Sequence, residues 1–244
     1  MLEPSSSIQI GGAAVKPVSH SVEADEEPPR ASAESALRRE IRSLGEQVTR
    51  LAPACRGMSV TWTEHTATFT LVASDPEIAV LDALQYLGGG PADDVVARRQ
   101  GIEADIESLL SENSWTLFAR ATLARGVRSI LALPLTQHGR VIGAVTFHGR
   151  TADAFDGTHA EIARVLAAWA PTAIALTTPV LPESRTVEPP RALRDEGMIN
   201  RAIATMAAAR GVNTVATKEL LGDAAARAGV SQGRVAEAVL QVHP

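Results

Sequence analysis

The sequence predicts an α+β domain with an antiparallel sheet and flanking helices, followed by a small all-α module. The main observation is segment 54–176, where short runs rich in β-branched residues alternate with helical runs. MSVTWTEHTATFTLVAS (58–74) predicts two alternating strands, and RSILALPLTQHGRVIGAVTFHG (128–149) predicts two apolar strands joined by a tight turn. Helical runs between and after these strands complete the α+β pattern.

Two further observations set the C-terminal part apart. Segment 177–190 contains four prolines and no apolar period, which predicts a semi-rigid linker. Segment 191–244 is alanine-rich, with breaks at Gly211 and at AGVSQG (228–233), and therefore predicts three helices.

The bulk composition is that of a globular protein, with 244 residues and 45% hydrophobic residues. No run approaches the roughly 18 apolar residues of a membrane span, and no signal-peptide pattern opens the chain, so we expect a cytoplasmic protein. The net charge of -5 excludes a globally basic nucleic-acid binder but not a local basic patch. Residues 1–30 are acidic and rich in Ser, Gly and Pro, which predicts a disordered tail.

Segment 31–53 predicts an amphipathic helix whose apolar residues follow a heptad spacing. This spacing favours a coiled coil that pairs two copies into a homodimer, and the alternative is an amphipathic helix lying on its own domain. The predicted dimerisation residues are Leu37, Ile41, Leu44, Val48 and Leu51.

Four stretches of the middle segment carry a family resemblance: LDALQYLGGGP (81–91), SWTLFARATLARGVRSILALPL (114–135), GRVIGAVTFHG (139–149) and AFDGTHAEIARVLAAWA (154–170). Together with the preceding strand pair, these stretches make segment 54–176 resemble a GAF domain, a small-molecule-sensing α+β module. The resemblance implies a sensor with an unidentified small-molecule ligand, since members of this family bind many compounds and some bind none.

Large aromatic residues are the candidates for an apolar ligand pocket, and their alternative is a place in the ordinary core. The run Gly88-Gly89-Gly90-Pro91 has two interpretations as well, a close backbone approach to a ligand or only a helix stop. The predicted pocket residues are Trp62, Phe69, Tyr86, Trp115 and Phe118.

The C-terminal stretches MINRAIATMAAARGV (198–212), ATKELLGDAA (216–225) and GRVAEAV (233–239) resemble an ANTAR domain, the three-helix RNA-binding module of transcription antiterminators. Their position after a GAF-like domain fits the same regulator architecture. The resemblance implies binding of RNA hairpins in a nascent transcript. One departure is that the Ala-Lys-Gly triplet usual in the family's first helix is Ala202-Ile203-Ala204 here.

Two alternatives remain open for this module. AAARAGVSQGRVAEAV (224–239) also resembles a DNA-binding helix-turn-helix, with Ala225, Gly229 and Val235 at the usual offsets and Ser231 placed to cap the next helix. The other alternative is a dimeric scaffold that binds no nucleic acid, which the missing lysine keeps open.

RNA binding by this module would depend on charge, because segment 191–244 contains no Phe, Tyr or Trp on which a base could stack. We therefore expect strong salt dependence. A solvated charged face is the alternative interpretation of its basic residues. The predicted RNA-binding residues are Arg194, Arg201, Arg210, Lys218, Arg227 and Arg234.

Catalytic and metal-binding patterns are missing from the sequence. Cys55 is the only cysteine, the histidines are not at metal-ligand spacing, and the common nucleophile, phosphate-loop and zinc motifs are absent. We expect no catalytic residues, no metal and no cofactor. The sequence as a whole predicts a signal-responsive regulator that is not an enzyme.

Overall fold

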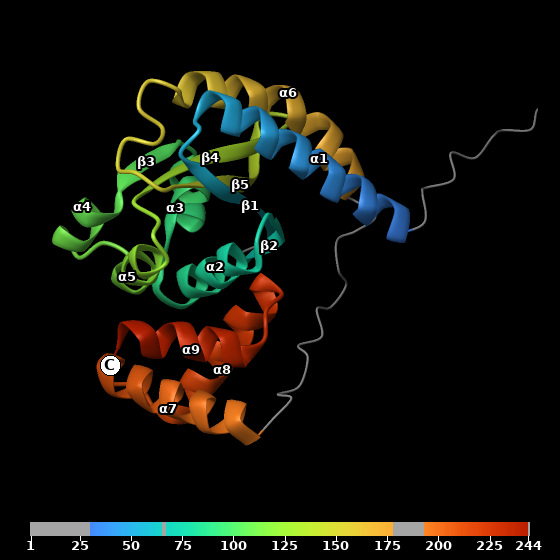
Figure 1. The fold of residues 1–244 in the computed structure, drawn as a ribbon. Helices are drawn as coiled ribbons and strands as arrows, with labels where there is room; N and C mark the ends of the chain where they lie inside the picture. The colour runs from blue at the N-terminus through green and yellow to red at the C-terminus, as the bar shows by residue number, and fades with distance from the viewer. Residues whose placement is uncertain (1–29, 65–66, 178–192, 244) are drawn as a thin grey trace, which may run out of the picture.

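The computed structural model describes residues 30–64, 67–177 and 193–243 (Figure 1). The predicted tail, except for residue 30, lies outside the described residues, and so does the predicted linker beyond residue 177. No helix in the described ranges is long and apolar enough to cross a membrane.

A five-stranded antiparallel sheet forms the centre of the first part of the chain, as the sequence predicts. Its strands are β1 (Cys55–Glu64), β2 (Ala67–Ala73), β3 (Ile102–Asp105), β4 (Ser129–Gln137) and β5 (Arg140–Gly149). The strand order is β2-β1-β5-β4-β3. The predicted hairpin is β4–β5, and its two turn residues, His138 and Gly139, have φ values of 49° and 74°. Positive φ at both positions is the signature of the tight hairpin turn that matches the twist of the strands.

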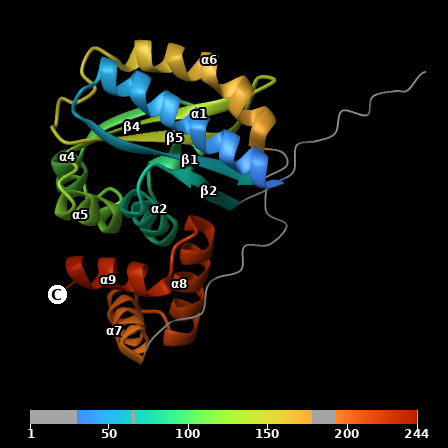
Figure 2. The ribbon, with the colours of Figure 1, turned by 45° about the vertical axis from the view of Figure 1, so that its right-hand side comes forward.

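Helices cover both faces of this sheet (Figures 1 and 2). One face lies under α1 (Arg30–Leu51) and α6 (His159–Thr177), which run side by side. The other face is covered by four further helices: α2 (Pro76–Gly88), α3 (Pro91–Arg98), α4 (Ile106–Ser111) and α5 (Thr116–Ala124). Successive strand residues point to opposite faces, so Met58 and Val60 pack under α1 and α6, whereas Ser59 and Thr61 face α2.

The predicted dimer seam is buried within the chain, and this corrects the coiled-coil interpretation. Leu44 and Val48 are 0% exposed, and they belong with Leu37 and Ile41 to the apolar cluster that joins α1 to α6 and the sheet. The Trp169 indole on α6 donates a hydrogen bond to the Glu40 carbonyl, with Nε1 3.0 Å from the oxygen. Leu51, at the end of the seam, is half-buried. Because a sheet face needs apolar cover, the helix lies on its own domain, as the alternative interpretation has it.

The C-terminal part forms the three predicted helices, α7 (Leu193–Arg210), α8 (Thr214–Ala228) and α9 (Gln232–Val242). Ser231 caps α9, as predicted: its Oγ accepts a hydrogen bond from the Arg234 backbone N–H at 3.4 Å. Asn213 caps α8 in the same way, through Ala216 N–H at 2.7 Å. Gly229 ends α8 in the left-handed conformation, with φ of 66°.

These three helices, called the C-terminal module below, lie against the helical layer formed by α2 and α5 (Figures 1 and 2). One apolar cluster runs through both parts, from Leu84 of α2 to Leu221 of α8 and Val239 of α9. Helix α9 lies between α7 on one side and α2 and α5 on the other. The module and the sheet domain therefore share a core.

Candidate functional site

A buried polar cluster lies between the sheet and α2. It begins with side chains of three neighbouring strands that share the α2 face: Ser59 and Thr61 on β1, Thr70 on β2, and Thr146 and His148 on β5. The strand register aligns them, because Ser59 pairs with Thr146 and Thr61 pairs with Thr70. All five are buried, so this sheet face is polar without meeting water.

Asp82 on α2 lies at the centre of this cluster. Its carboxylate accepts hydrogen bonds from Ser59 Oγ at 3.0 Å, Thr70 Oγ1 at 2.9 Å and Gln85 Nε2 at 2.8 Å. Burial raises the pKa of Asp82 from 3.8 to about 7, against the effect of these hydrogen bonds. Gln85 also accepts a hydrogen bond from the Ala92 N–H at 3.1 Å, which ties α2 to the start of α3.

Other polar atoms of the cluster have no partner. Both ring nitrogens of His148 and the hydroxyls of Thr146 and Thr122 are buried and form no hydrogen bond with any residue that the structure describes. Burial, with a smaller effect of the Arg56 charge, lowers the pKa of His148 to about 3, so its imidazole is neutral at pH 7. A neutral imidazole has one donor and one acceptor to offer. Buried polar groups are normally paired, so these atoms make the cluster a candidate for a ligand site.

The five predicted pocket aromatics are not brought together, and this is a correction. Trp62 and Phe69 pair across β1 and β2 on the α1/α6 side, whereas Tyr86, Trp115 and Phe118 lie in the α2/α5 layer. The sheet separates the two groups because the strand residues point to the opposite face. Only the second group borders the polar cluster: the Phe118 and His148 ring centroids are 6.5 Å apart, and so are those of Trp115 and Phe118.

The glycine run after α2 acts as a helix stop and as room for Gln85. Gly89 has φ of 81°, a conformation that favours glycine, and it ends α2. A Cβ on Gly90 would lie 2.2 Å from the Gln85 Cβ, so any larger residue there would displace the side chain that joins α2 to α3.

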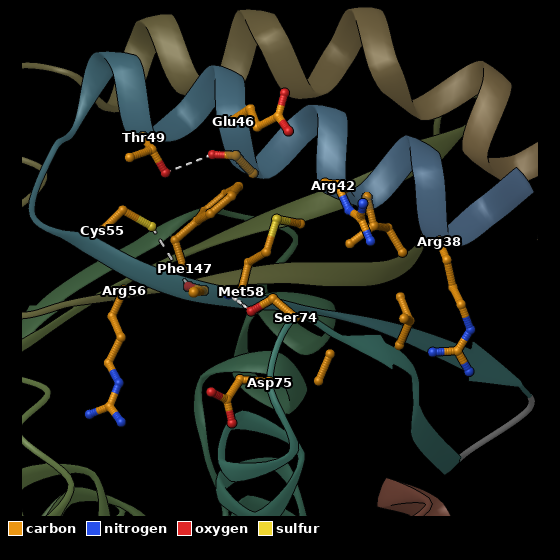
Figure 3. Close-up of a pocket in the computed structure, with 15 residues that line it drawn as sticks. Arg38, Arg42, Glu46, Thr49, Cys55, Arg56, Met58, Ser74, Asp75 and Phe147 are labelled. Carbon is orange, nitrogen blue, oxygen red and sulfur yellow. Dashed lines mark hydrogen bonds between the residues drawn. The ribbon is translucent and has the colours of Figure 1, made fainter. Parts of the chain in front are cut away.

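A separate open groove lies between α1 and the β1–β2 edge (Figure 3). Its volume is about 450 Å³, and none of the predicted pocket aromatics lines it. Arg38 and Arg42 reach it from α1, and Ser74 and Asp75 reach it from the β2–α2 connection. Ser74 Oγ accepts a hydrogen bond from the Met58 N–H at 2.9 Å, and this holds the groove floor. Sequence reasoning missed this groove because its walls come from distant segments.

Three of the predicted RNA-binding arginines bond to the sheet domain, although Arg210 is exposed and the other two are only partly buried. Arg210 Nη2 donates to the Leu87 carbonyl at 2.7 Å, at the end of α2. Arg227 Nε donates to the Thr68 carbonyl at 2.6 Å, and its guanidinium lies 4.1 Å from the centre of the Tyr86 ring. Arg234 forms an ion pair with Glu77.

The remaining basic residues differ in their surroundings. Arg201 on α7 and Lys218 on α8 are exposed. The side chain of Arg194 lies outside those that the structure describes. Of the six predicted RNA-binding residues, Arg210, Arg227 and Arg234 therefore bond to the sheet domain, and RNA binding by the six stays a prediction.

Glu77, in the first turn of α2, joins three helices. Its carboxylate binds Arg234 of α9 and Arg125 of α5, with the Arg125 Nε–Glu77 Oε2 distance at 3.0 Å. Partial burial works to raise the pKa of Glu77, but the hydrogen bonds from Arg125 and Arg234 outweigh it and hold the pKa below its usual value.

Tyr86 extends the polar cluster toward the module. Its hydroxyl lies 2.9 Å from Thr70 Oγ1. Burial and the Asp82 charge raise the Tyr86 pKa well above 10, so the phenol keeps its proton. Because the Thr70 hydroxyl donates to Asp82, the Tyr86 hydroxyl donates to Thr70. A continuous polar chain thus runs from Asp82 to the ring that Arg227 covers.

The helix that a DNA-binding helix-turn-helix would insert into a groove is covered in this structure. Its counterpart is α9, which packs against α7 on one side and against α2 and α5 on the other. Val235 and Val239 are 0% exposed, and Arg234, the candidate for base contact, is paired with Glu77.

Comparison with known proteins gives the family of the sheet domain. The GAF domain family model matches residues 37–174, more than half of the chain, and ends before the C-terminal module. The ANTAR resemblance of the module thus stays a prediction. No curated protein gives a significant match.

Three of the matching solved structures have low sequence identity to this chain. A GAF/HD domain protein from Geobacter sulfurreducens is 19% identical, with 61% of this chain and 96% of that chain covered and a TM-score of 0.43. The type II free methionine-R-sulfoxide reductase from Thermoplasma acidophilum is 15% identical, with the same coverage and TM-score. Escherichia coli SdiA is 13% identical, with 87% and 97% covered and a TM-score of 0.43.

The family match agrees with the architecture described above. The matched residues run from the apolar stripe of α1, through the five-stranded antiparallel sheet, to the end of α6. They include the polar cluster around Asp82. On this match the chain belongs to the GAF domain family.

Proposed function

We propose that the chain is a ligand-responsive regulator that acts by binding and not by catalysis. The GAF domain takes a small molecule at the polar cluster around Asp82 and His148, and the C-terminal module is the output. The observation that carries this proposal is the group of buried polar atoms on His148, Thr146 and Thr122 that lack a partner among the described residues, with Thr146 opposite Ser59, which bonds to Asp82.

The chemistry of the cluster narrows the ligand class. The side chains that face it are hydroxyls, an amide, a neutral imidazole and one carboxyl, which together offer both donors and acceptors. These groups suit an uncharged or basic molecule and provide no positive charge for an anion. The Phe118 ring beside His148 adds an apolar surface for a flat group.

A thermal-shift screen of small uncharged and basic metabolites tests this site. A ligand that raises the Tm of the wild-type protein should raise it much less in Thr146→Val and His148→Phe, which remove polar atoms that have no partner within the described part of the chain. Thr61→Val is the matched control, because the Thr61 hydroxyl is already satisfied by the Ala144 carbonyl at 3.1 Å. Equal shifts in all four proteins would place the ligand elsewhere.

The finer part of the proposal is that the module binds RNA hairpins and causes antitermination. Its support is the resemblance of the module to an ANTAR domain and the exposure of Arg201 and Lys218. Without aromatic residues in the module, binding depends on phosphate contacts and falls steeply with salt. The homodimer is also proposed, on a surface other than the buried α1 seam.

Binding of the full-length protein to a hairpin-RNA pool and to duplex DNA, over a salt series, tests this output. Arg201→Ala/Lys218→Ala should weaken hairpin binding, and Arg164→Ala, at an exposed position of α6, is the control. A preference for duplex DNA would favour the helix-turn-helix alternative. Absence of binding to both would favour the protein scaffold.

A further inference from the structure

We infer that docking of the C-terminal module is the signal-controlled step: the chain Asp82–Thr70–Tyr86–Arg227 couples the buried site to docking, and docking withholds Arg210, Arg227 and Arg234 from a polyanionic partner. This inference rests on the proposed function and specifies how the same site is regulated. Its first support is that the four residues belong to three elements, α2, β2 and α8, that contact one another through this chain and through the apolar layer around it.

The inner end of the chain is held inside the GAF domain. Asp82 accepts from Thr70 at 2.9 Å, and the same Thr70 hydroxyl accepts from Tyr86 at 2.9 Å. Asp82 and Thr70 are 0% and 2% exposed, so water does not replace either bond. A ligand that hydrogen-bonds to Asp82 competes directly with Thr70 for the carboxylate.

The outer end of the chain belongs to the module. Arg227 of α8 covers the Tyr86 ring at 4.1 Å and donates to the Thr68 carbonyl at 2.6 Å. Thr68 and Thr70 are two residues apart on β2, so one strand carries both contacts. A shift of Thr70 or Tyr86 therefore moves the groups that Arg227 contacts, without any change in the module itself.

Docking and ligand entry are mutually dependent for a geometric reason. The polar cluster is covered by α2 and α5, so a ligand reaches it only when these helices move. The same two helices are the surface on which α8 and α9 pack. A ligand that binds better when the α2 layer is open thus binds better to the released state than to the docked state. A population shift requires this difference in affinity.

Docking also engages three cations of the module in bonds to the sheet domain. Arg210, Arg227 and Arg234 are bonded to the Leu87 carbonyl, the Thr68 carbonyl and the Glu77 carboxylate. Release would free these three guanidinium groups from their present bonds and add them to Arg201 and Lys218, which are exposed in the docked structure. The released module therefore has the larger electrostatic attraction to a phosphate backbone.

Spin-label distances in the full chain test the coupling without any ligand or RNA. The labels sit on Ala167→Cys of α6 and Glu219→Cys of α8, both exposed positions, in a Cys55→Ala background. Thr70→Val removes the central hydroxyl, and Tyr86→Phe removes the outer one while keeping the ring under Arg227. Each should increase the ratio of released to docked protein about tenfold, seen as a longer and broader distance distribution.

Thr61→Val is the matched control, since it is the same substitution on the same sheet face and its hydroxyl bonds to the Ala144 carbonyl. Release in Thr70→Val and Tyr86→Phe with a wild-type distance in Thr61→Val supports the coupling. Wild-type distances in both test variants overturn it, and equal release in Thr61→Val overturns the role of this particular chain.

Hairpin-RNA affinity of Tyr86→Phe completes the test. An affinity above wild type supports masking of the three arginines, and unchanged affinity in a released protein overturns it. Thr146 lies outside the contact chain Asp82–Thr70–Tyr86–Arg227, so the thermal-shift comparison of Thr146→Val with wild type tests the ligand site while leaving that chain intact. It therefore separates a failure of the ligand site from a failure of the coupling.

Discussion

The two faces of the GAF sheet are built from alternate residues of the same strands, yet they have opposite character. Under α1 and α6 the strands present Val60, Val145 and Phe147, all at most 1% exposed and all apolar. Under α2 the neighbouring positions carry Ser59 and Thr146, and Thr146 has no hydrogen-bond partner. Both faces are equally dry. The apolar face thus supplies stability, whereas the polar face gives up some stability, as expected if it is the proposed ligand site.

The largest expected effect comes from charging the apolar face. Leu44→Asp places a carboxylate at a position that is 0% exposed in the cluster between α1, α6 and the sheet. We expect a loss of about 4 kcal/mol or more in the free energy of unfolding, because cavity and desolvation costs add. Urea denaturation measures it, with Arg39→Asp on the exposed side of α1 as control. A folded, stable monomer would instead support the dimer-seam interpretation.

Asp82 and His148, two residues of the polar face, should change the free energy of unfolding with pH in opposite directions. The pKa of Asp82 is raised to about 7, so its neutral form is favoured and its contribution to stability, full below its unfolded pKa near 4, is lost as pH rises through 7. The pKa of His148 is lowered to about 3, so it costs stability as pH falls below its unfolded pKa near 6.5. The two contributions oppose each other between pH 4 and 6.5.

Variants should separate these two contributions. In His148→Phe the unfolding free energy should fall by a few kcal/mol as pH rises from about 4 to 7, because Asp82 acts alone. In Asp82→Asn it should instead fall as pH drops below about 6.5. Denaturation midpoints over this pH range measure both, and parallel profiles in the two variants would contradict the assignment. Asp93 and Tyr86, which also face Asp82, are left unchanged in both.

A smaller effect compares two threonines of the polar face. Thr146→Val should stabilise the ligand-free protein by about 1 kcal/mol, because it removes a buried hydroxyl with no partner. Thr61→Val should destabilise by a similar amount, since it breaks the bond to the Ala144 carbonyl. Thermal unfolding compares the pair. Destabilisation by both would mean that Thr146 has a partner in solution.

The smallest effect is expected at the rim of the docked module. Glu77→Gln weakens the contacts to Arg125 and Arg234, and because Glu77 is 42% exposed we expect less than about 1 kcal/mol. Hydrogen exchange of the α9 backbone measures the loss. The effect should shrink further at high salt, since the lost term is an ion pair near solvent. A larger loss at high salt would indicate a packing role for this side chain.

Sequence periodicity was enough to predict the helices and strands, but it did not predict which surfaces they pack against. The β4–β5 hairpin, the cap at Ser231 and the three C-terminal helices follow from local patterns. The spacing of Leu44 and Val48 correctly indicated one apolar stripe, but a stripe of this kind fits a second copy or its own sheet equally well. The structure decides because α6 and the sheet offer the matching surface.

The candidate site was missed for a related reason. Alternating hydroxyls at 59 and 61, and polar residues at 146 and 148, resemble a strand with one solvated face. Their burial depends on α2. This helix is apolar on nearly all sides, and it is therefore covered both by the sheet and by the C-terminal module. That feature was the available signal. The same holds for the arginines of the module, because a charge pattern identifies a polar helix face but does not tell what that face contacts.

The position of α2 between the sheet and the module has a consequence for cooperativity. Leu84 of α2 belongs to one apolar cluster with Leu221 and Val239 of the module, so no boundary of solvent divides the two parts. Heating should melt them in a single transition. A fragment that ends at α6 would expose a helix whose outer side is made for burial, and it would tend to self-associate. In this chain the GAF domain is one part of a larger folding unit.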